Sequence, residues 1–350
     1  MFKHIIANNP NEALETGLWH LKTAGVVNDS RNGRVVQAQG PVLTTYLYPR
    51  ERVMFSALRD ANPFFHLYEA LWMLAGRKDA ASVSRFAKQM ESFADGDGQL
   101  WGAYGWRWRY FFGFDQLGQI LALLKADPKT RRAVLSMWSA VGDLVSVAGG
   151  DGGMASKDVP CNTHVYFDMT QGSLDMTVCN RSNDIVWGAY GANIVHMSIL
   201  QEFVACAVGV PVGVYNQFSN NFHAYIDRPD VQRLIDTASS TKQAGWTVAY
   251  VADDRYSRLS KPVGLMPEGN AHWGDWLAEC EALVDYPYSE DKWRFAFFRY
   301  TVQPLMLAHE AYKAGAIGRA IELAAQCEAF DWRAAATEWL QRRQLKGVQA

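Results

Sequence analysis

Residues suited to covalent chemistry on a nucleotide follow one another through the middle of the chain. They are a cysteine, an arginine–serine pair, a carboxylate, an amide and a histidine–tyrosine pair: Cys161, Arg181-Ser182, Asp184, Asn193, and His223 with Tyr225. A cysteine thiolate is a strong nucleophile, and arginine binds phosphate through paired hydrogen bonds. Histidine and tyrosine both donate and accept hydrogen bonds, which suits a sugar hydroxyl.

Each of these groups also has a plainer interpretation. A single cysteine is more often a small core residue than a nucleophile. Taken alone, Arg181-Ser182-Asn183-Asp184 is a polar turn, and a histidine near aromatic residues is structural. Glu69 lies inside the apolar stretch 64–75, where a carboxylate is costly unless it is paired, functional or at a solvent-facing helix edge. The order of the whole set, rather than any single member, favours chemistry.

Three further segments carry charge. Residues 127–132 (Asp-Pro-Lys-Thr-Arg-Arg) contain the pair Arg131 and Arg132, and alone they indicate a solvated turn. Residues 100–109 interleave aromatics with arginines, as in a stacking surface for single-stranded nucleic acid. The formal net charge of −2 argues against that use, so we expect core aromatics and a functional Tyr104. Residues 95–98 (Asp-Gly-Asp-Gly) lack the terminal Glu of a calcium loop and indicate a turn.

The composition indicates a globular protein with a large core. Of the 350 residues, 49% are hydrophobic and 13% aromatic, enough apolar area to offset the entropy of folding. The five cysteines form no CxxC pair, which favours a reducing compartment over disulfides and does not suggest zinc. The chain shows neither a signal peptide nor an apolar run of about 20 residues. We therefore expect a cytoplasmic protein with no membrane, metal or nucleic-acid partner.

The elements that must position these groups are a mixture of helices and strands. Helices are expected at 11–24, 64–75, 80–92, 116–126, 194–208, 302–325 and 331–344, and strands at 43–48, 132–138, 163–169 and 174–179. The Gly-rich stretch 142–157 predicts a mobile loop just before Cys161. Because the elements follow no βαβ rhythm, the sequence predicts an α+β fold with a mixed or antiparallel sheet, in one domain.

From about residue 15 to 230 the chain resembles the thymidylate synthase family, including its pyrimidine hydroxymethylase branch. The motifs are Glu69-Ala70-Leu71-Trp72, Tyr104-Gly105 with Trp108-Arg109, Asp127-Pro128 with Arg131-Arg132, Pro160-Cys161, Arg181-Ser182-Asn183-Asp184, Asn193, and His223-Ala224-Tyr225. The resemblance implies a thymidylate synthase-like domain over 1–350 that pairs sheet to sheet as a homodimer. The helical region from about 240 to 350 diverges from the family.

The resemblance also implies a reaction. Cys161 would attack C6 of a pyrimidine, which makes C5 nucleophilic toward the one-carbon unit of 5,10-methylenetetrahydrofolate. Glu69 and Tyr104 would organise water and proton transfer, and Asp184 would face the folate. The implied nucleotide-binding residues are Arg181 and Ser182 with Arg31 (less firmly Arg34) for the phosphate, Arg131 and Arg132 of the partner subunit, Asn193 for the base, and His223 with Tyr225 for the ribose.

The product depends on what reaches the methylene group left on C5 after tetrahydrofolate departs. Hydride gives a methyl group, and water gives a hydroxymethyl group. Three departures from the synthase pattern favour water. Residues 88–94 lack the usual tryptophans, Asn162 replaces the usual histidine, and 344–350 lack the small apolar tail that closes the synthase site.

The leading hypothesis is therefore conversion of dUMP to 5-hydroxymethyl-dUMP, as used for modified bases in viral DNA. The amide of Asn193 fits the O4/N3 edge of uracil, whereas cytosine-specific relatives tend to carry a carboxylate there. The interval from Asp184 to Asn193 is one residue longer than usual, so dCMP and CMP stay open. The alternatives, in order, are a thymidylate synthase, a dCMP or CMP hydroxymethylase, and a non-catalytic binding protein.

Overall fold

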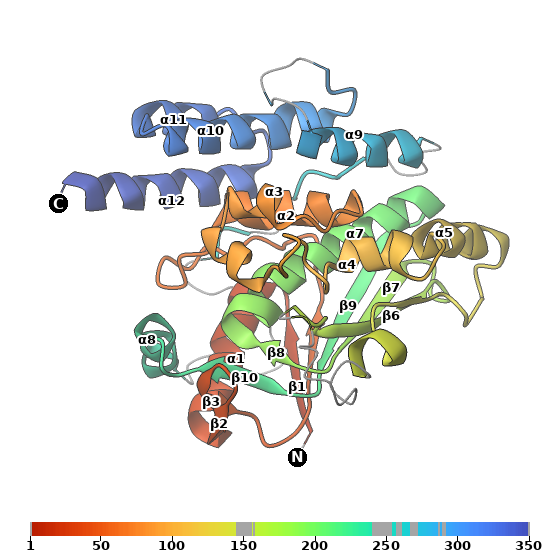
Figure 1. Cartoon of the computed structure of the whole chain (residues 1–350), viewed down its shortest axis with the longest axis horizontal. Helices are drawn as coiled ribbons and strands as arrows, with labels where there is room; N and C mark the ends of the chain where they lie inside the picture. The colour runs from red at the N-terminus through yellow and green to blue at the C-terminus, as the bar shows by residue number, and fades with distance from the viewer. Residues whose placement is uncertain are drawn as a thin grey trace.

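The structure of the 350-residue chain is a computed structural model that describes residues 2–144, 156, 158–239, 254–256, 261–266, 272–285, 288 and 292–348. The described strands form two sheets. The larger sheet has six strands in the spatial order β1 (Lys3–Ala7), β4 (Val42–Tyr46), β9 (Val212–Ser219), β7 (Leu174–Asn180), β6 (Asn162–Asp168) and β5 (Val134–Ser136). Pairs β1/β4 and β9/β7 are parallel, and the others are antiparallel. This mixed sheet with helices packed against it (Figure 1) confirms the expected α+β class.

The smaller sheet joins segments that are far apart in sequence. Its four strands lie in the order β2 (Val26–Ser30), β3 (Gly33–Gln37), β10 (Phe222–Tyr225) and β8 (Asn183–Asp184). Because β8 runs parallel to β10, Asp184 lies opposite His223. The sheet therefore brings two predicted site residues together.

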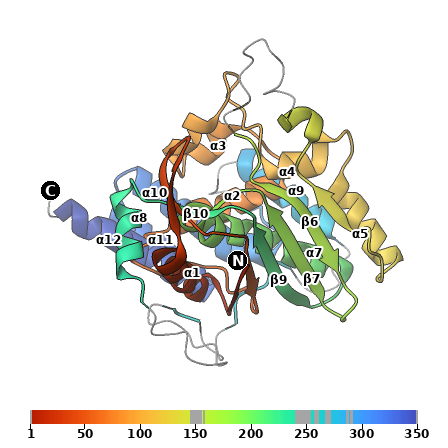
Figure 2. The same cartoon turned by 90° about the horizontal axis from the view of Figure 1, so that it is seen from below.

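The larger sheet has one buried face and one open face. A row of buried residues crosses all six strands: Ile5, Thr44, Gln217, Val178, Val165 and Leu135. The next row points to the other side and is partly or fully exposed: Ile6, Thr45, Asn216, Thr177, Tyr166 and Val134. This follows from the two-residue period of a strand. In Figure 2 the strands β9, β7 and β6 face the viewer with none of the described helices in front of them.

Two buried helices cover the other face. Helix α7 (Asn193–Val208) is buried on all sides, packs on β7 and β9, and ends at Gly209, whose φ of +84° suits a helix stop. Helix α2 (Pro63–Leu74) is wholly buried, begins with the Asn62 side chain accepting from the Phe65 N–H, and packs across α7. The stretch Ile185–Val208 would be long and apolar enough to span a membrane, but 94% of its apolar window is buried inside the protein, as in a core helix.

The remaining helices among the described residues up to 239 pack around this centre. They are α1 (Pro10–Ala24), α3 (Ala80–Ser84), α4 (Tyr104–Trp106), α5 (Gln116–Ala126) and α8 (Pro229–Thr237), with the 3₁₀ helix η1 (Lys88–Phe93) and the π-helical segments η2 (Arg107–Phe111), η3 (Ala140–Leu144) and η4 (Ile185–Ala192). The segment from 101 to 109 is mainly structural, as expected. Trp108 is buried, and the buried Arg107 forms an ion pair of 2.8 Å with Asp143.

The C-terminal helices form a further layer. They are α9 (Trp273–Asp285), α10 (Gln303–Lys313) preceded by the π-helical η5 (Phe298–Val302), α11 (Ile317–Ala324) and α12 (Phe330–Val348). Figure 1 shows this layer on the side of α2 away from the sheet, and α9, α10 and α12 all contact α2. The single-domain organisation stays a prediction.

Four predicted elements are wrong in extent. The helix expected at 331–344 continues to Val348 as α12. The single helix expected at 80–92 is split, because Ala87 is extended (φ −145°, ψ 93°) between α3 and η1. The helix expected at 302–325 is broken at Gly315, which has φ +80°. The strand expected at 132–138 covers only β5. Most of the loop expected at 142–157 lies outside the described residues.

Candidate active site

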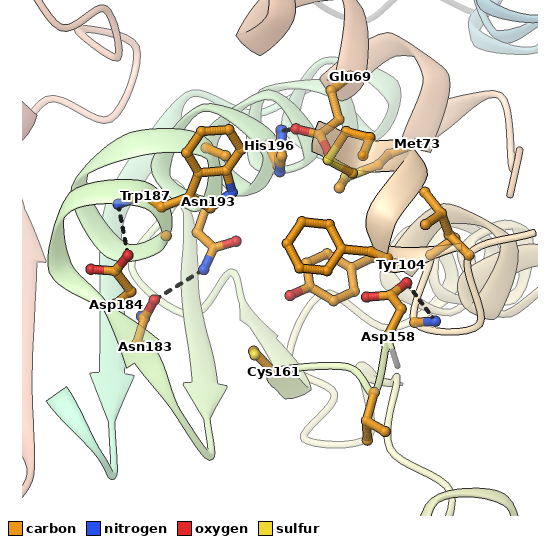
Figure 3. Close-up of a pocket in the computed structure, with 18 of the residues that line it drawn as sticks. Glu69, Met73, Tyr104, Asp158, Cys161, Asn183, Asp184, Trp187, Asn193 and His196 are labelled. Atoms are coloured by element: carbon orange, nitrogen blue, oxygen red, sulfur yellow. Dashed lines mark hydrogen bonds and ion pairs between the residues drawn. The ribbon is translucent and has the colours of Figure 1, made fainter. Parts of the chain in front are cut away.

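Most of the predicted site residues line two adjoining hollows. A cavity of about 230 Å³ between α2, α4, η4 and α7 is lined by Glu69, Tyr104, Cys161, Ser182, Asp184 and Asn193, among others (Figure 3). A wider hollow of about 580 Å³ is lined by Arg31, Cys161, Arg181, Ser182, His223 and Tyr225, among others. Cys161 and Ser182 line both hollows. Of the predicted residues, Arg131 and Arg132 line neither hollow, and both side chains are exposed; the less firmly predicted Arg34 also lines neither.

The candidate nucleophile and the candidate phosphate ligand form one structural unit. Cys161 stands at the start of β6, and its carbonyl accepts the backbone N–H of Arg181 at 2.9 Å. The Arg181 guanidinium donates to the carbonyls of Pro160 (2.9 Å) and Val159 (3.0 Å) and lies 5.6 Å from the Trp138 ring centroid. The thiol is thus next to a guanidinium that keeps donors available for an anion.

Burial decides the ionisation of the thiol. It raises the pKa of Cys161 above the usual value, and the carboxylates of Asp158 and Asp184 act in the same direction. The charges of Arg181 and Arg31 lower the pKa of Cys161, but they do not outweigh burial. At neutral pH the free protein therefore holds a thiol, which must lose its proton when the sulfur attacks.

A close backbone approach places Tyr104. A Cβ atom on Gly105 would lie 1.6 Å from the carbonyl oxygen of Met73, so only glycine lets α4 rest directly on α2. Burial, followed by the nearby Cys161, raises the pKa of Tyr104 well above 10. Tyr104 is therefore a neutral phenol, able to donate a hydrogen bond into the cavity.

Glu69 is paired with a histidine that sequence reasoning missed. Nε2 of His196 lies 2.9 Å from Oε2 of Glu69, which is an ion-pair distance without the alignment of a good hydrogen bond. His196 lies on α7 three residues after Asn193 and also lines the cavity. That spacing puts both side chains on one helix face, a signal the sequence contained.

The extra residue before Asn193 is absorbed in η4. This eight-residue segment is π-helical, with wider turns than an α-helix, and has non-helical angles at Tyr190 and Gly191. Asn193 consequently begins α7 and lines the cavity. Its Nδ2 donates to Oδ1 of Asn183 at 3.1 Å, which fixes the orientation of the amide.

Asp184 and His223 are neighbours across β8 and β10. Oδ1 and Oδ2 of Asp184 accept the N–H groups of Val186 (3.0 Å) and Trp187 (3.3 Å), so Asp184 caps η4 while lining the cavity. Burial raises the pKa of Asp184 and lowers that of His223, and the proximity of the two groups opposes both shifts.

The histidine and tyrosine of β10 face the same side, as their spacing predicts. Nδ1 of His223 lies 2.8 Å from Oδ1 of Asn221, and the His223 and Tyr225 ring centroids are 5.1 Å apart. Both rings line the wider hollow.

The structure separates the two N-terminal arginines. Arg31 lines the wider hollow. Arg34 instead donates to Asp227 through its backbone N–H (2.7 Å) and its Nε (2.8 Å). Arg31 is therefore the better candidate for a phosphate contact.

Other residues at the site had not been predicted, or had been predicted differently. Asp158 lines both hollows, and Trp187 lines the smaller cavity. Asn162 is fully buried, and the described residues supply neither of its side-chain polar atoms with a hydrogen-bond partner. It lines neither hollow, so it does not supply a group to the cavity.

The smaller cavity has an apolar wall of the kind that binds a flat heteroaromatic ring. Five large side chains form it: Trp72, Met73, Met90, Phe93 and Trp187. The carboxylates of Asp158 and Asp184 stand among them. An apolar wall with a few polar groups is typical of pockets for cofactor-sized molecules, so these residues fit the pterin ring of a folate.

Comparison with known proteins identifies the class of protein to which this fold and site belong. A family model described as thymidylate synthase matches residues 28–244. The chain therefore belongs to the thymidylate synthase family, which confirms the resemblance noted in the sequence.

Three relatives illustrate the range of the match. Over 351 aligned positions, the chain is 43% identical to a deoxyuridylate hydroxymethyltransferase of Pseudomonas phage M6, covering 97% of this chain and 94% of the relative. It is 34% identical to the protein of the same name from Bacillus phage SP01, over 74% of this chain and 69% of the relative. It is 29% identical to a thymidylate synthase of Symbiobacterium thermophilum, over 66% of this chain and 80% of the relative.

Proposed function

We propose that this protein is a deoxyuridylate hydroxymethyltransferase, which converts dUMP to 5-hydroxymethyl-dUMP through a covalent adduct of Cys161. The observation that carries the proposal is the position of this thiol at the junction of two hollows. One hollow has an apolar wall suited to flat rings, and the other has arginines for a phosphate. The names of the two phage relatives support the choice of substrate and product.

The nucleotide would lie across both hollows. Arg181, Ser182 and Arg31 bind the phosphate, because all three residues line the wider hollow and carry hydrogen-bond donors. His223 and Tyr225 bind the ribose from the same hollow. The oriented amide of Asn193 hydrogen-bonds the O4/N3 edge of uracil in the smaller cavity.

The chemistry begins when the Cys161 sulfur bonds to C6 and the ring C5 becomes nucleophilic. When bound against the apolar wall, 5,10-methylenetetrahydrofolate supplies a one-carbon unit to C5. Tyr104 donates a hydrogen bond as a neutral phenol, and Glu69 organises water and proton transfer with His196 beside it. Asp184 caps η4 and faces the folate.

Water, rather than hydride, completes the reaction in this proposal. The wall formed by η1 contributes Met90 and Phe93 to the cavity and no tryptophan. Phe93 is 40% exposed, so this side of the cavity is incompletely sealed. Water that reaches the C5 methylene from here gives the hydroxymethyl product.

The open face of the large sheet is the proposed dimer interface, with a second copy of the chain as occupant. Its exposed row crosses all six strands and includes Ile6, which is 51% exposed, and Tyr166, which is 43% exposed. Arg131 and Arg132 are exposed next to the edge strand β5. That placement allows them to contact the phosphate of the partner subunit's nucleotide rather than their own.

Mass spectrometry of the nucleotide tests the proposal directly. Incubation of dUMP with methylenetetrahydrofolate should give 5-hydroxymethyl-dUMP and tetrahydrofolate in equal amounts. Formation of dTMP in step with dihydrofolate would establish a thymidylate synthase instead, and a parallel panel of dCMP and CMP tests the base. We place the activity in the cytoplasm, the host's if the chain is viral, where the product would supply a modified DNA base.

A further inference from the structure

A carboxylate that takes no part in the chemical steps proposed above stands at the junction of the two hollows. Asp158 lines the smaller cavity together with Tyr104 and Glu69, and it lines the wider hollow together with Arg181 and His223. In Figure 3 it lies on the Tyr104 side of the open space, across from Asn193, with Cys161 between them at the base. A group there meets both the reacting ring and water arriving from the wider hollow.

The chain holds Asp158 in place through a backbone contact. Oδ2 accepts the N–H of Gly102 at 2.9 Å, and the described residues supply no hydrogen-bond donor to Oδ1. A Cβ atom on Gly102 would lie 2.8 Å from the Asp158 carbonyl oxygen and 3.1 Å from each carboxylate oxygen. Residue 102 must therefore be small for the carboxylate to occupy this position.

We propose that Asp158 is the general base that removes a proton from the water that adds to the C5 methylene group. The inference rests on the proposed hydroxymethyl transfer. Cys161 binds C6, and Asn193 reads the edge that contains C4. C5 lies between these two ring atoms, and in this placement its substituent lies in the cavity whose wall includes Asp158, Tyr104 and Glu69. Three carboxylates line the smaller cavity. Glu69 is 2.9 Å from His196, Asp184 accepts two backbone N–H groups, and of the three only Asp158 also lines the wider hollow.

The bonds balance without an oxidant or a reductant. The water oxygen bonds to the methylene carbon, and the proton that it loses passes to the Asp158 carboxylate. The electron pair of the methylene double bond moves through C5 to the O4 carbonyl as an enolate. When the enolate collapses, the C5–C6 double bond re-forms and the bond between C6 and the Cys161 sulfur breaks. The thiolate that leaves is reprotonated, and the proton on Asp158 returns to solvent.

The surroundings of Asp158 suit a base that works near neutral pH. Burial raises its pKa to about 6, the charges of Glu69 and Asp95 act in the same direction, and Gly102 N–H and Arg107 oppose them. Tyr104 and Cys161 also face the carboxylate, and both are neutral at pH 7 because burial raises their pKa values. Asp158 is therefore ionised at pH 7, yet more basic than an exposed carboxylate, which favours proton removal.

The test separates the two halves of the reaction in a single turnover. Release of tritium from [5-³H]dUMP reports the transfer of the one-carbon unit, because C5 loses its hydrogen when it gains the carbon. Mass spectrometry reports the hydroxymethyl product. In Asp158→Asn we expect the rate of tritium release to stay within about twofold of wild type. The rate of product formation should fall about 100-fold, the usual range for loss of a general base.

The pH profile and a matched variant complete the test. In wild type the rate of product formation should rise with pH around a midpoint of about 6, and this dependence should disappear in Asp158→Asn. Asp97→Asn, which removes an exposed carboxylate outside both hollows, should change neither rate. Equal affinities of wild type and Asp158→Asn for dUMP establish that the variant is folded.

Two outcomes would overturn the inference. One is product formation in Asp158→Asn within threefold of wild type. The other is a parallel loss of tritium release and product, which would assign Asp158 to an earlier step. Formation of dTMP and dihydrofolate by the wild-type protein is a different failure, because it removes the proposed function itself.

Discussion

The Arg181→Ala variant tests the phosphate site with the least ambiguity. The guanidinium has five N–H groups, and two of them are donated to the carbonyls of Pro160 and Val159. The others are available to a phosphate. A hydrogen bond to a charged group contributes about 1.5–3 kcal/mol. Because Arg181 is exposed, solvent and salt screen the interaction toward the lower end of that range. We therefore expect dUMP to bind about 10- to 30-fold more weakly.

The assay compares two ligands by isothermal titration calorimetry. Deoxyuridine lacks the phosphate, so its affinity should change less than about twofold in Arg181→Ala if the lost contact is to the phosphate. The matched control is Arg34→Ala, since the Arg34 guanidinium contacts Asp227 and lines neither hollow. An equal loss of affinity for deoxyuridine and dUMP would refute the reasoning. It would mean that Arg181 acts by holding the backbone before Cys161.

Three further predictions follow from the site. Cys161→Ser should abolish turnover while calorimetry gives a dUMP affinity within about threefold of wild type; unchanged turnover would remove the covalent mechanism. Alkylation of Cys161 by iodoacetamide at pH 7 should be slower than that of free cysteine, because burial raises the pKa of this thiol. The Cys161→Ser protein gives the background rate of alkylation at the other cysteines. Alkylation of Cys161 faster than that of free cysteine would contradict the burial argument. If Arg131 and Arg132 act across a dimer, mixing Cys161→Ala with an Arg131→Ala/Arg132→Ala double variant should restore about a quarter of wild-type activity. Half of randomly paired dimers are mixed, and each mixed dimer has one complete site out of two. No recovery of activity after subunit exchange would assign these arginines elsewhere.

Asp158→Asn has a second expected effect, on stability. The pKa of Asp158 is raised from 3.8 to about 6, and each pKa unit corresponds to about 1.4 kcal/mol, so the ionised group disfavours folding by on the order of 2–3 kcal/mol. This cost is complete above about pH 6 and absent below about pH 4, where the carboxyl is protonated in both states. The variant should therefore be more stable than wild type toward urea at pH 7, with the difference shrinking as the pH falls to 4. Lower stability of the variant at pH 7 would contradict the raised pKa.

Sequence patterns predicted the elements whose ends are set locally. Helices α1, α2, α5 and α7 were placed to within a residue at each end, because capping side chains, prolines or a terminal glycine mark them. Strands β1, β2, β3, β8, β9 and β10 were not predicted. Their existence depends on distant partners, since β1 pairs with β4 and β9 joins β4 to β7. Short strands of this kind carry little signal of their own.

The site residues likewise fall into those that the sequence predicted and those that only the fold reveals. Residues such as Cys161, Arg181 and Asn193 were predicted because their chemical types and their order along the chain can be read from the sequence alone. Asp158 was not, since nothing nearby in sequence marks it, and only the approach of Gly102 aims its carboxylate into the cavity. His196 could have been found from its spacing to Asn193.

The ionisation of the thiol links nucleotide binding to catalysis. The charges of Arg181 and Arg31 lower the pKa of Cys161, while burial raises it above the usual value. A bound phosphate would neutralise part of this positive charge and exclude water, so both effects of substrate binding would raise the pKa further. A preformed thiolate therefore becomes less favourable when the substrate is present. Proton removal must then accompany the bonding of sulfur to C6, and the nearby neutral Tyr104 is a donor rather than an acceptor for that step. The acceptors that line a hollow with Cys161 are the carboxylates of Asp158 and Asp184 and the imidazole of His223, whose pKa burial lowers so that it is neutral at pH 7.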